Sequence, residues 1–294
     1  MQSDGTFLCL ASGTAFGAMA IFGKLAYDDG ATVGTLLAVR FTLAAALFWA
    51  TGAARELRGV SRRDVAAGLG LGACGYALQA GCYFAALERI DASLLSLLVY
   101  TFPGIVAIAA VALSRERMSA RRGVALALAS GGLTLVVAGS GAGAIEPLGA
   151  ALGLGAAVVY SAYILVSDGV AGRVPARALA TLVCTGAAIS LTGGSALLGD
   201  LRPGELTVSG WCWLACLAAV CTVGAISLFF AGLRRVGPTA ASILATVEPL
   251  VTVVLAFLVF GEALEAVQVG GGVLLLAAVP VLQRRRSNHE RSTA

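Results

Sequence analysis

The chain has 294 residues, of which 59% are hydrophobic and 12% are charged, and its mean hydropathy is +0.91. Soluble domains keep a polar face on each helix, whereas apolar residues here run right round the predicted helices, so the composition excludes a soluble globular protein. The formal net charge of +4 does not indicate nucleic acid, because the arginines are scattered over many loops without a basic domain.

Ten stretches of the chain are apolar over about the 20 residues that a helix needs to cross a membrane. In chain order they are residues 6–26, 31–52, 65–87, 92–113, 122–139, 148–167, 178–198, 211–232, 238–260 and 265–282. The first stretch lacks a basic start and a small-residue cleavage site, so we expect it to remain as the first helix. The runs are too long and too rich in Ala, Leu and Gly for barrel strands. The sequence therefore predicts an all-α integral membrane protein with about ten transmembrane helices.

Small residues recur along the predicted spans and favour close packing between helices. Gly13 and Gly17 share a face of the first span, and Gly149 and Gly153 do the same in the sixth. All seven cysteines lie inside predicted spans, without metal-site spacing and without a pair in one external loop. We interpret them as small apolar residues, and we expect neither a metal nor a cofactor.

Basic residues mark the loops that stay in the cytoplasm. Nearly all of the arginines follow an even-numbered span or the last span, namely Arg55, Arg58, Arg62, Arg63, Arg115, Arg117, Arg121, Arg122, Arg173, Arg177, Arg234, Arg235, Arg284, Arg285, Arg286 and Arg291. The opposite side carries Lys24, Arg89 and Arg202. Both termini are therefore predicted to be cytoplasmic, and snorkelling of the side chain to the interface accounts for Lys24.

A shift of 146 residues aligns the two halves of the chain without a gap. It places FAALERID at 84–91 on FAGLRRVG at 230–237, and it pairs Arg89 with Arg235, Pro103 with Pro249 and Glu116 with Glu262. The loop after the fourth span carries four arginines, whereas the equivalent loop after the ninth carries Glu262 and Glu265. Opposite charge in equivalent loops indicates that a set of five spans is repeated upside down. The predicted units are a repeat at 1–140, an inverted repeat at 147–283 and a cytoplasmic tail at 284–294.

Hydroxyl groups follow one face of the fourth span and the matching face of the ninth. The fourth span carries Ser93, Ser96, Tyr100 and Pro103 at helical spacing, and the matching positions of the ninth are Thr239, Ser242, Thr246 and Pro249. We expect both faces to line a substrate cavity; the alternative is hydrogen bonding between helices or back to the helix itself. The two prolines should bend their helices as a paired hinge, with a static kink as the alternative.

Tyrosines gather on the third and sixth spans. Tyr76, Gln79 and Tyr83 share one face, and Tyr160 and Tyr163 share another. An aromatic cavity with a few polar tips would favour apolar or aromatic side chains over sugars or phosphates. The alternative is anchoring of the tyrosines at the membrane interface, which suits Tyr83.

Two charged residues, Arg40 and Glu248, lie deep in predicted spans, where a charge costs roughly 2.5 to 3.5 kcal/mol. We expect them to interact directly or through water, or Arg40 to bind carbonyls near Pro249. Arg40 is either structural or a partner for a substrate carboxylate. Glu248 is the proton-coupling candidate, although its helical phase departs from the hydroxyl face of the ninth span.

Together these features resemble the drug/metabolite transporter superfamily, and within it the EamA-type ten-helix carriers, over essentially the whole chain. The residues that carry the likeness are Phe16-Gly17, Lys24, Arg40-Phe41, Pro103, Glu248-Pro249 and Gly261-Glu262. Phe16 stands where many members have tryptophan. The resemblance implies a secondary carrier, often an exporter of amino acids or other metabolites, with a central cavity lined mainly by helices one, three, four, six, eight and nine. Within the family the chain is most similar to the aromatic amino acid exporters.

Transport is the function that these observations favour. The chain has no GxxxxGK[ST] loop, so it does not use ATP itself, and its only histidine, His289, is in the tail, so we do not expect an enzyme. We predict a multi-pass secondary transporter of the cell (inner) membrane, with a monomer favoured, that exports small metabolites by alternating access. Amino acids with aromatic or other apolar side chains are the favoured substrates. The alternatives are a drug or lipid flippase, a nucleoside or sugar carrier and, more distantly, a membrane enzyme.

Overall fold

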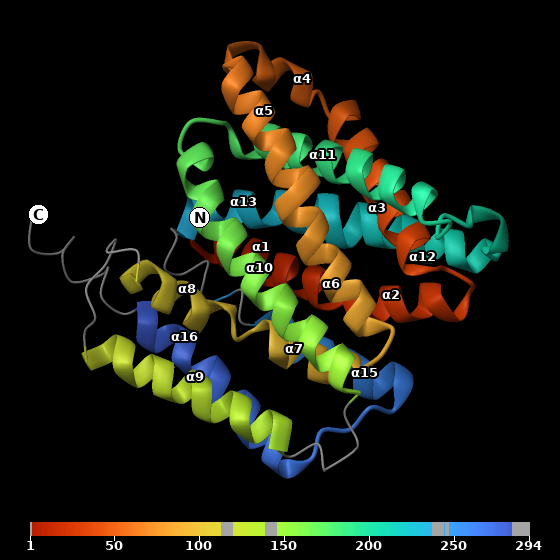
Figure 1. Cartoon of the computed structure of the whole chain (residues 1–294). Coiled ribbons are helices and arrows are strands. Elements are labelled where there is room, and N and C mark those ends of the chain that lie inside the picture. The colour runs from red at the N-terminus through yellow and green to blue at the C-terminus, as the bar shows by residue number, and fades with distance from the viewer. Residues whose placement is uncertain (1, 113–119, 139–145, 237–243, 245–246, 284–294) are drawn as a thin grey trace, which may run out of the picture.

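The computed structural model describes residues 2–112, 120–138, 146–236, 244 and 247–283. Over these residues the chain consists of helices joined by short connections, and none of these residues belongs to a β-strand (Figure 1). The prediction of an all-α protein is confirmed for this part of the chain.

The helices follow one another closely. The first half contains α1 (Gln2–Gly17), α2 (Met19–Asp28), α3 (Val33–Ala50), α4 (Ala53–Glu56), α5 (Arg62–Gly70), α6 (Ala77–Leu87), α7 (Ala92–Val99), α8 (Phe102–Ala112) and α9 (Ala120–Ala138). The second half contains α10 (Pro147–Ala171), α11 (Ala176–Leu197), α12 (Val208–Ala218), α13 (Ala225–Val236), α15 (Val247–Phe260) and α16 (Ala266–Gln283). Single 3₁₀ turns lie at Leu57–Gly59 and Pro203–Glu205.

Six helical segments of the described residues are long and apolar enough to cross a membrane. They are Asp4–Asp28, Val33–Ala50, Arg62–Leu87, Pro147–Ala171, Ala176–Leu197 and Val208–Leu233. Four shorter apolar helices are Ala92–Val106, Ala127–Val136, Val247–Phe260 and Ala266–Ala278. Each of these segments overlaps one of the ten stretches that the sequence predicts, in the same order. The chain is a multi-pass membrane protein, and the crossing of all ten segments stays a prediction.

Two of the long segments contain a π-helical turn. Residues Leu71–Tyr76 join α5 to α6, and residues Ala219–Gly224 join α12 to α13. The two turns occupy corresponding places, in the third and the eighth predicted span. The first packs against α11 and the second against α3. Turns of this kind are frequent at functional sites, because the wider turn redirects the side chains that follow.

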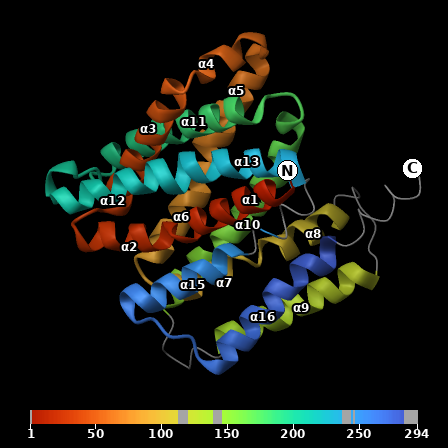
Figure 2. The ribbon, with the colours of Figure 1, turned by 180° about the vertical axis from the view of Figure 1, so that it is seen from behind.

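The helix contacts are repeated by the two halves of the chain. A contact between two spans has a counterpart between the corresponding spans. The α1–α2 span packs against α12 and α13, and the α10 span packs correspondingly against the first π turn and α6. Helix α15 lies against α1, as α7 and α8 lie against α10. The pairs α3 with α11, α7 with α15 and α9 with α16 each join corresponding spans. The α9–α16 pair lies along one edge of the molecule in both views (Figures 1 and 2).

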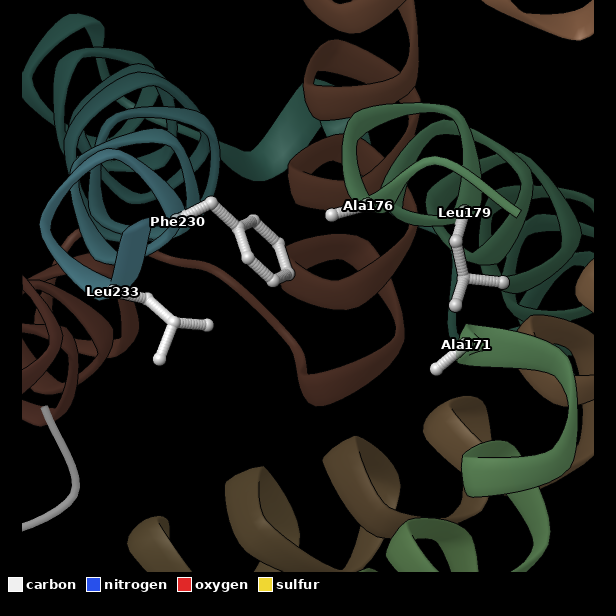
Figure 3. A pocket seen from close by; sticks show the side chains of 5 residues that line it. All are labelled: Ala171, Ala176, Leu179, Phe230 and Leu233. Carbon is white, nitrogen blue, oxygen red and sulfur yellow. The ribbon is translucent and has the colours of Figure 1, made fainter. Parts of the chain in front are cut away.

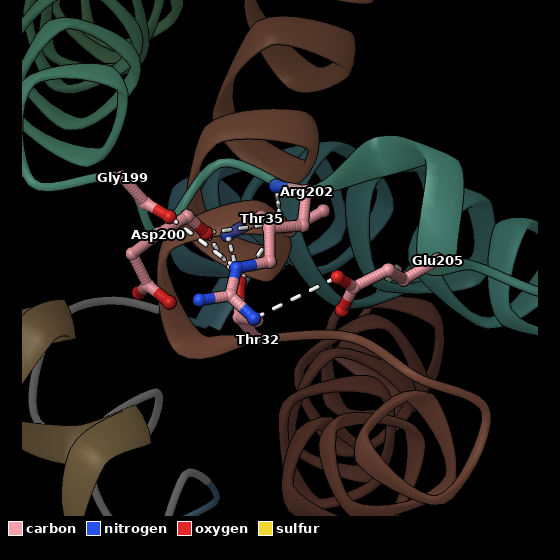
Figure 4. A network of polar contacts seen from close by, with 6 residues as sticks. All are labelled: Thr32, Thr35, Gly199, Asp200, Arg202 and Glu205. Carbon is pink, nitrogen blue, oxygen red and sulfur yellow. Dashed lines mark hydrogen bonds and ion pairs between the residues drawn. The ribbon is translucent and has the colours of Figure 1, made fainter.

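Polar contacts join the connection between α2 and α3 to the connection between α11 and α12 (Figure 4). The hydroxyls of Thr32 and Thr35 both donate to the carbonyl oxygen of Asp200. The Asp200 carboxylate accepts from the backbone N–H of Gly34 at 2.7 Å, and the Arg202 N–H donates to the Thr35 hydroxyl at 2.7 Å. The bond from Gly34 satisfies a backbone N–H in the first turn of α3 that has no partner within the helix.

Asp29 strengthens the same end of the molecule. Its carboxylate accepts hydrogen bonds from the hydroxyls of Thr207 at 2.7 Å and Ser209 at 2.8 Å, and from the indole N–H of Trp213 at 2.9 Å. These bonds, that of Thr207 foremost, hold the pKa of Asp29 below its usual value.

The opposite ends of the same helices are joined by ion pairs. Arg173 reaches Asp64 at 2.7 Å, and Arg177 reaches Glu56 at 2.7 Å. Contacts at both ends therefore hold α1–α3, α5–α6 and α10–α13 together, and we call this group of helices the six-span bundle.

Glycines allow the helices to approach closely where the sequence predicts packing surfaces. A Cβ atom on Gly17 would lie 2.7 Å from the carbonyl oxygen of Glu248, and one on Gly153 would lie 3.2 Å from a leucine side chain of α7. Gly132 and Gly271 meet in the α9–α16 pair, where a Cβ atom on either would lie 2.6 Å from the carbonyl oxygen of the other. The interpretation of the span glycines as packing surface is confirmed at these positions.

Candidate functional site

Six aromatic rings form a continuous chain between the two halves of the protein. They come from α3, the first π turn, the junction of α7 and α8, and α10, and neighbouring ring centroids lie between 4.9 and 6.3 Å apart. In order they are Tyr100, Phe102, Tyr160, Tyr163, Tyr76 and Phe41. We call this set the aromatic arc. Edge-to-face contacts dominate it, as the charge distribution of aromatic rings favours.

Arg40 lies at one end of the aromatic arc. Its guanidinium is centred 5.0 Å from the ring of Phe41 and 5.2 Å from that of Phe84, within cation–π range. The residue is 2% exposed, and its Nε donates to the hydroxyl of Thr222 at 3.0 Å. Thr222 lies in the second π turn and donates to the carbonyl oxygen of Leu217 at 2.9 Å, five residues earlier in α12. The π turn thereby presents an acceptor to the buried cation.

Glu248 lies at the other end of the aromatic arc. It belongs to the first turn of α15, and its carboxylate accepts a hydrogen bond from the Tyr100 hydroxyl at 3.2 Å. Arg40 and Glu248 do not form an ion pair with each other among the described contacts, so the direct interaction that the sequence suggests is absent from this structure. The arc instead separates a carboxylate from a guanidinium.

Pro103 lies in the first turn of α8, directly after the break between α7 and α8. Proline is well tolerated there, because its missing N–H would have no partner within the helix. Pro249 lies in α15. At Pro103 the span is broken rather than smoothly bent, and hinge motion stays a prediction.

The remaining predicted residues are distributed unevenly. Tyr83 is buried and packs edge-to-face against Phe84 at 5.1 Å, beside the Arg40 guanidinium. Gln79 is half-buried on α6.

The predicted hydroxyl faces are described only in part. Ser96 is buried and its hydroxyl donates to the carbonyl oxygen of Ser93 at 2.8 Å, so it bonds back to its own helix. Ser242 and Thr246 lie outside the described residues.

Sequence reasoning missed the role of Lys24. Its side chain is 21% exposed and its Nζ lies 2.6 Å from a carboxylate oxygen of Glu262, whose side chain is 8% exposed. This ion pair, rather than snorkelling to the interface, accounts for the lysine. The available signal was two opposite charges on the same predicted side of the membrane, Lys24 near the end of the first span and Glu262 in the loop after the ninth.

Two pockets lie at the arginine-bearing ends of the spans. An apolar pocket of about 330 Å³ lies between the ends of α10, α11 and α13 (Figure 3). It is lined by Ala171, Ala176, Leu179, Phe230 and Leu233. A polar pocket of about 410 Å³ is lined by Ser61, Arg63, Asp64 and Arg173. The described residues contain no group of three or more His, Cys, Asp or Glu side chains that could hold a metal ion.

Comparison with known proteins gives a consistent result. The family model described as the EamA-like transporter family matches residues 4–138 and again residues 147–282. A Bacillus subtilis protein named "Uncharacterized transporter YcbK" is 26% identical over 276 residues, which are 91% of this chain and 88% of that protein. An Archaeoglobus fulgidus protein named "Uncharacterized transporter" is 29% identical over 229 residues, covering 78% of this chain and 80% of that protein.

A solved crystal structure shares the fold. It superimposes with a TM-score of 0.65 over 97% of this chain and 100% of its own, at 20% sequence identity.

Proposed function

The chain belongs to the EamA-like transporter family, and on this premise we propose that it is a secondary carrier that exports amino acids with aromatic or other apolar side chains. The observation that carries the choice of substrate is the aromatic arc, which has a carboxylate at one end and a buried guanidinium at the other.

The ammonium group and the apolar or aromatic side chain of such a substrate each have a matching group in the arc. Ring faces and edges attract apolar and aromatic side chains, and ring faces also attract cations. The Glu248 carboxylate is the natural partner for a substrate ammonium, because a charged acceptor in a poorly hydrated site forms strong hydrogen bonds. Arg40 is already bonded to Thr222 and packed between two rings, so we assign it a structural role. Sugars and phosphates would find few partners here.

We propose that the carrier works by alternating access between two inverted halves, 1–140 and 147–283, with both termini and the tail 284–294 in the cytoplasm of an inner-membrane protein. The paired helix contacts and the opposite charge of equivalent loops support this arrangement. The apolar pocket between α10, α11 and α13 then lies on the cytoplasmic side. About two helical turns of α10 separate its Ala171 from Tyr163 of the arc, which suits an entry for apolar substrates.

Uptake and counterflow in proteoliposomes test the substrate class, with and without a pH gradient. The panel contains phenylalanine, leucine, their des-amino acids, their amines, a nucleoside, a sugar and a phospholipid analogue. Phenylalanine and leucine should exchange, the amines should compete weakly, and the des-amino acids should not compete, because they lack the ammonium group. Movement of the sugar, the nucleoside or the lipid in place of any amino acid would replace the proposal with a carrier of that class or a flippase.

A pair of ring substitutions tests the site itself. Tyr160→Leu removes a ring from the middle of the arc, and Phe22→Leu removes one on α2 that stacks on Trp213 at 5.9 Å and belongs neither to the arc nor to the apolar pocket. We expect Tyr160→Leu to raise the KM for phenylalanine about tenfold and Phe22→Leu to leave it unchanged. Equal effects of the two substitutions would remove the arc from the substrate path.

A further inference from the structure

One carboxylate joins three separate helices at the end of the molecule opposite the arginine-rich loops. Oε1 of Glu262 accepts from Lys24 Nζ at 2.6 Å and from the backbone N–H of Ala92 at 3.2 Å. Oε2 accepts from both the N–H and the hydroxyl of Ser93, each at 3.0 Å. Lys24 also lies 3.7 Å from the carboxylate of Asp91. We call Lys24, Glu262 and the first turn of α7 the latch.

The latch bridges parts of the protein that are otherwise joined mainly by apolar packing. Lys24 belongs to α2 of the six-span bundle, whereas Ala92 and Ser93 begin α7, and Glu262 follows α15. The carboxylate therefore binds a cation from the bundle and, at the same time, the free N–H groups at the start of α7. An anion at a helix N-terminus is favoured by those N–H groups and by the helix dipole.

Glu262 is charged in this arrangement. Burial alone would raise the pKa of its carboxyl, but the hydrogen bond from Lys24 and the bonds from the backbone of Ser93 and Ala92 outweigh that effect and hold the pKa below its usual value. Separating Lys24 from Glu262 without water would leave two largely buried charges unpaired, which is strongly unfavourable. The contact is therefore stable either when fully closed or when opened wide enough for water to enter, as a two-state element requires.

We propose that the latch is the outer gate of the transport path, closed in this structure, and that its opening exposes the faces of α7 and α15 to the outside. The inference rests on the proposed function for its assignment of the outer side. The repeat register places Val170 opposite Lys24, so the second half lacks the matching cation. Loss of the latch should therefore shift the carrier toward the outward-open state.

The labelling rate of a single reporter cysteine measures how far the gate is open, and the measurement requires no knowledge of the substrate. Ser96→Cys places a thiol on α7 one turn inward from the latch, where the side chain is 6% exposed in the closed state. The full-length carrier is treated from outside with a membrane-impermeant maleimide, and peptide mass spectrometry separates the reporter from the native cysteines. We expect Glu262→Gln and Lys24→Gln each to raise the labelling rate of the reporter about fivefold, because each removes the charge pair that favours the closed state.

The matched control is Glu205→Gln. It breaks the contact of Glu205 with Arg202 at 3.6 Å on the same face of the protein, where both side chains are more than half exposed. The labelling rate of the reporter should stay unchanged. A reporter that reacts faster in both latch variants, but only in inside-out vesicles, would support the gate and contradict the proposed orientation.

A reversible cross-link tests the same gate by closing it. In the double variant Lys24→Cys/Glu262→Cys, a bifunctional methanethiosulfonate reagent that spans the length of the two lost side chains should bridge the thiols and slow substrate exchange at least about tenfold, and reduction should restore it. Unchanged reporter labelling in both single variants, together with full exchange by the cross-linked double variant, would overturn the proposal.

Discussion

The sequence predicts that Arg40 has a partner, but it does not predict which residue that partner is. A deep arginine in an apolar span must have partners, and that much follows from the sequence alone. The partner is Thr222, 182 positions away, on a π turn that no pattern in the sequence indicated. Long-range pairing of two polar groups depends on tertiary packing, so the charge was predictable and its contact was not.

Thr222→Val tests that contact. The substitution keeps the shape of the side chain but removes both the acceptor for Arg40 and the donor to Leu217, and leaves a buried cation with one bond fewer. We expect the free energy of unfolding to fall by about 1–3 kcal/mol, measured as thermal unfolding in detergent. Thr192→Val is the control, because the hydroxyl of that threonine has only a 3.5 Å contact with Thr42 in an exposed place. Equal melting temperatures for the two variants would contradict the assignment of Arg40 as a structural residue.

Glu248→Gln tests the proposed ammonium partner. The amide keeps an acceptor for the Tyr100 hydroxyl but loses the charge, so the KM for phenylalanine should rise about tenfold, which is the value of one charge-assisted bond. If wild-type transport depends on a pH gradient, the same variant should lose that dependence. An unaltered KM and an unaltered pH dependence would exclude Glu248 from both roles.

Asp29 gives a pH-dependent prediction. Its pKa is lowered in the folded state, so its contribution to stability is present above the ordinary value of about 3.9 and is lost as the pH falls through the folded value. Asp29→Asn should therefore lower the melting temperature at pH 7 and have a smaller effect at pH 3. Asp28→Asn, a substitution at the exposed neighbouring residue, should change neither. A deficit for Asp29→Asn that is as large at pH 3 as at pH 7 would contradict the lowered pKa.

Element positions were predicted well because long apolar runs have few alternatives in a membrane protein. All ten expected stretches contain an apolar helix at the expected place. The finer breaks were missed at Ala18 and at the two π turns, where no proline or polar run marks the change inside the apolar sequence. Pro103 was the informative exception, since it predicted a distortion and lies directly after a break.

Glycine positions in α11 predict a contrast within one helix. A Cβ atom on Gly186 would lie within 3.0 Å of the backbone of α5 and the first π turn, whereas one on Gly193 would meet nothing within 4 Å. Gly186→Ala should therefore lower the free energy of unfolding by about 1–3 kcal/mol, and Gly193→Ala should leave it nearly unchanged. Thermal unfolding of the two purified variants in one detergent measures the difference. Similar stabilities would mean that the approach of α11 to α5 is looser than described here.

At the scale of the whole molecule, the prediction concerns which side of the membrane each loop faces. Two inverted halves require residues 55–64 and 260–266 to lie in opposite compartments. Arg58→Cys should react with an impermeant maleimide only in inside-out vesicles, and Ala263→Cys only in whole cells; both parent residues are exposed. Reaction of both cysteines from one side would exclude the inverted arrangement, whatever the substrate is.

The sequence contains a single lysine, and that lysine is in the latch. Lys24 is thus the sole side chain in the sequence with a primary amine that an acylating reagent can modify. A reagent has limited access to this amine while the side chain is 21% exposed and held against Glu262, and access increases when the pair separates. The rate at which an amine-directed reagent labels Lys24 therefore reports whether the latch is open or closed. The measurement needs no engineered thiol, so it can be made on the unmodified carrier in its own membrane.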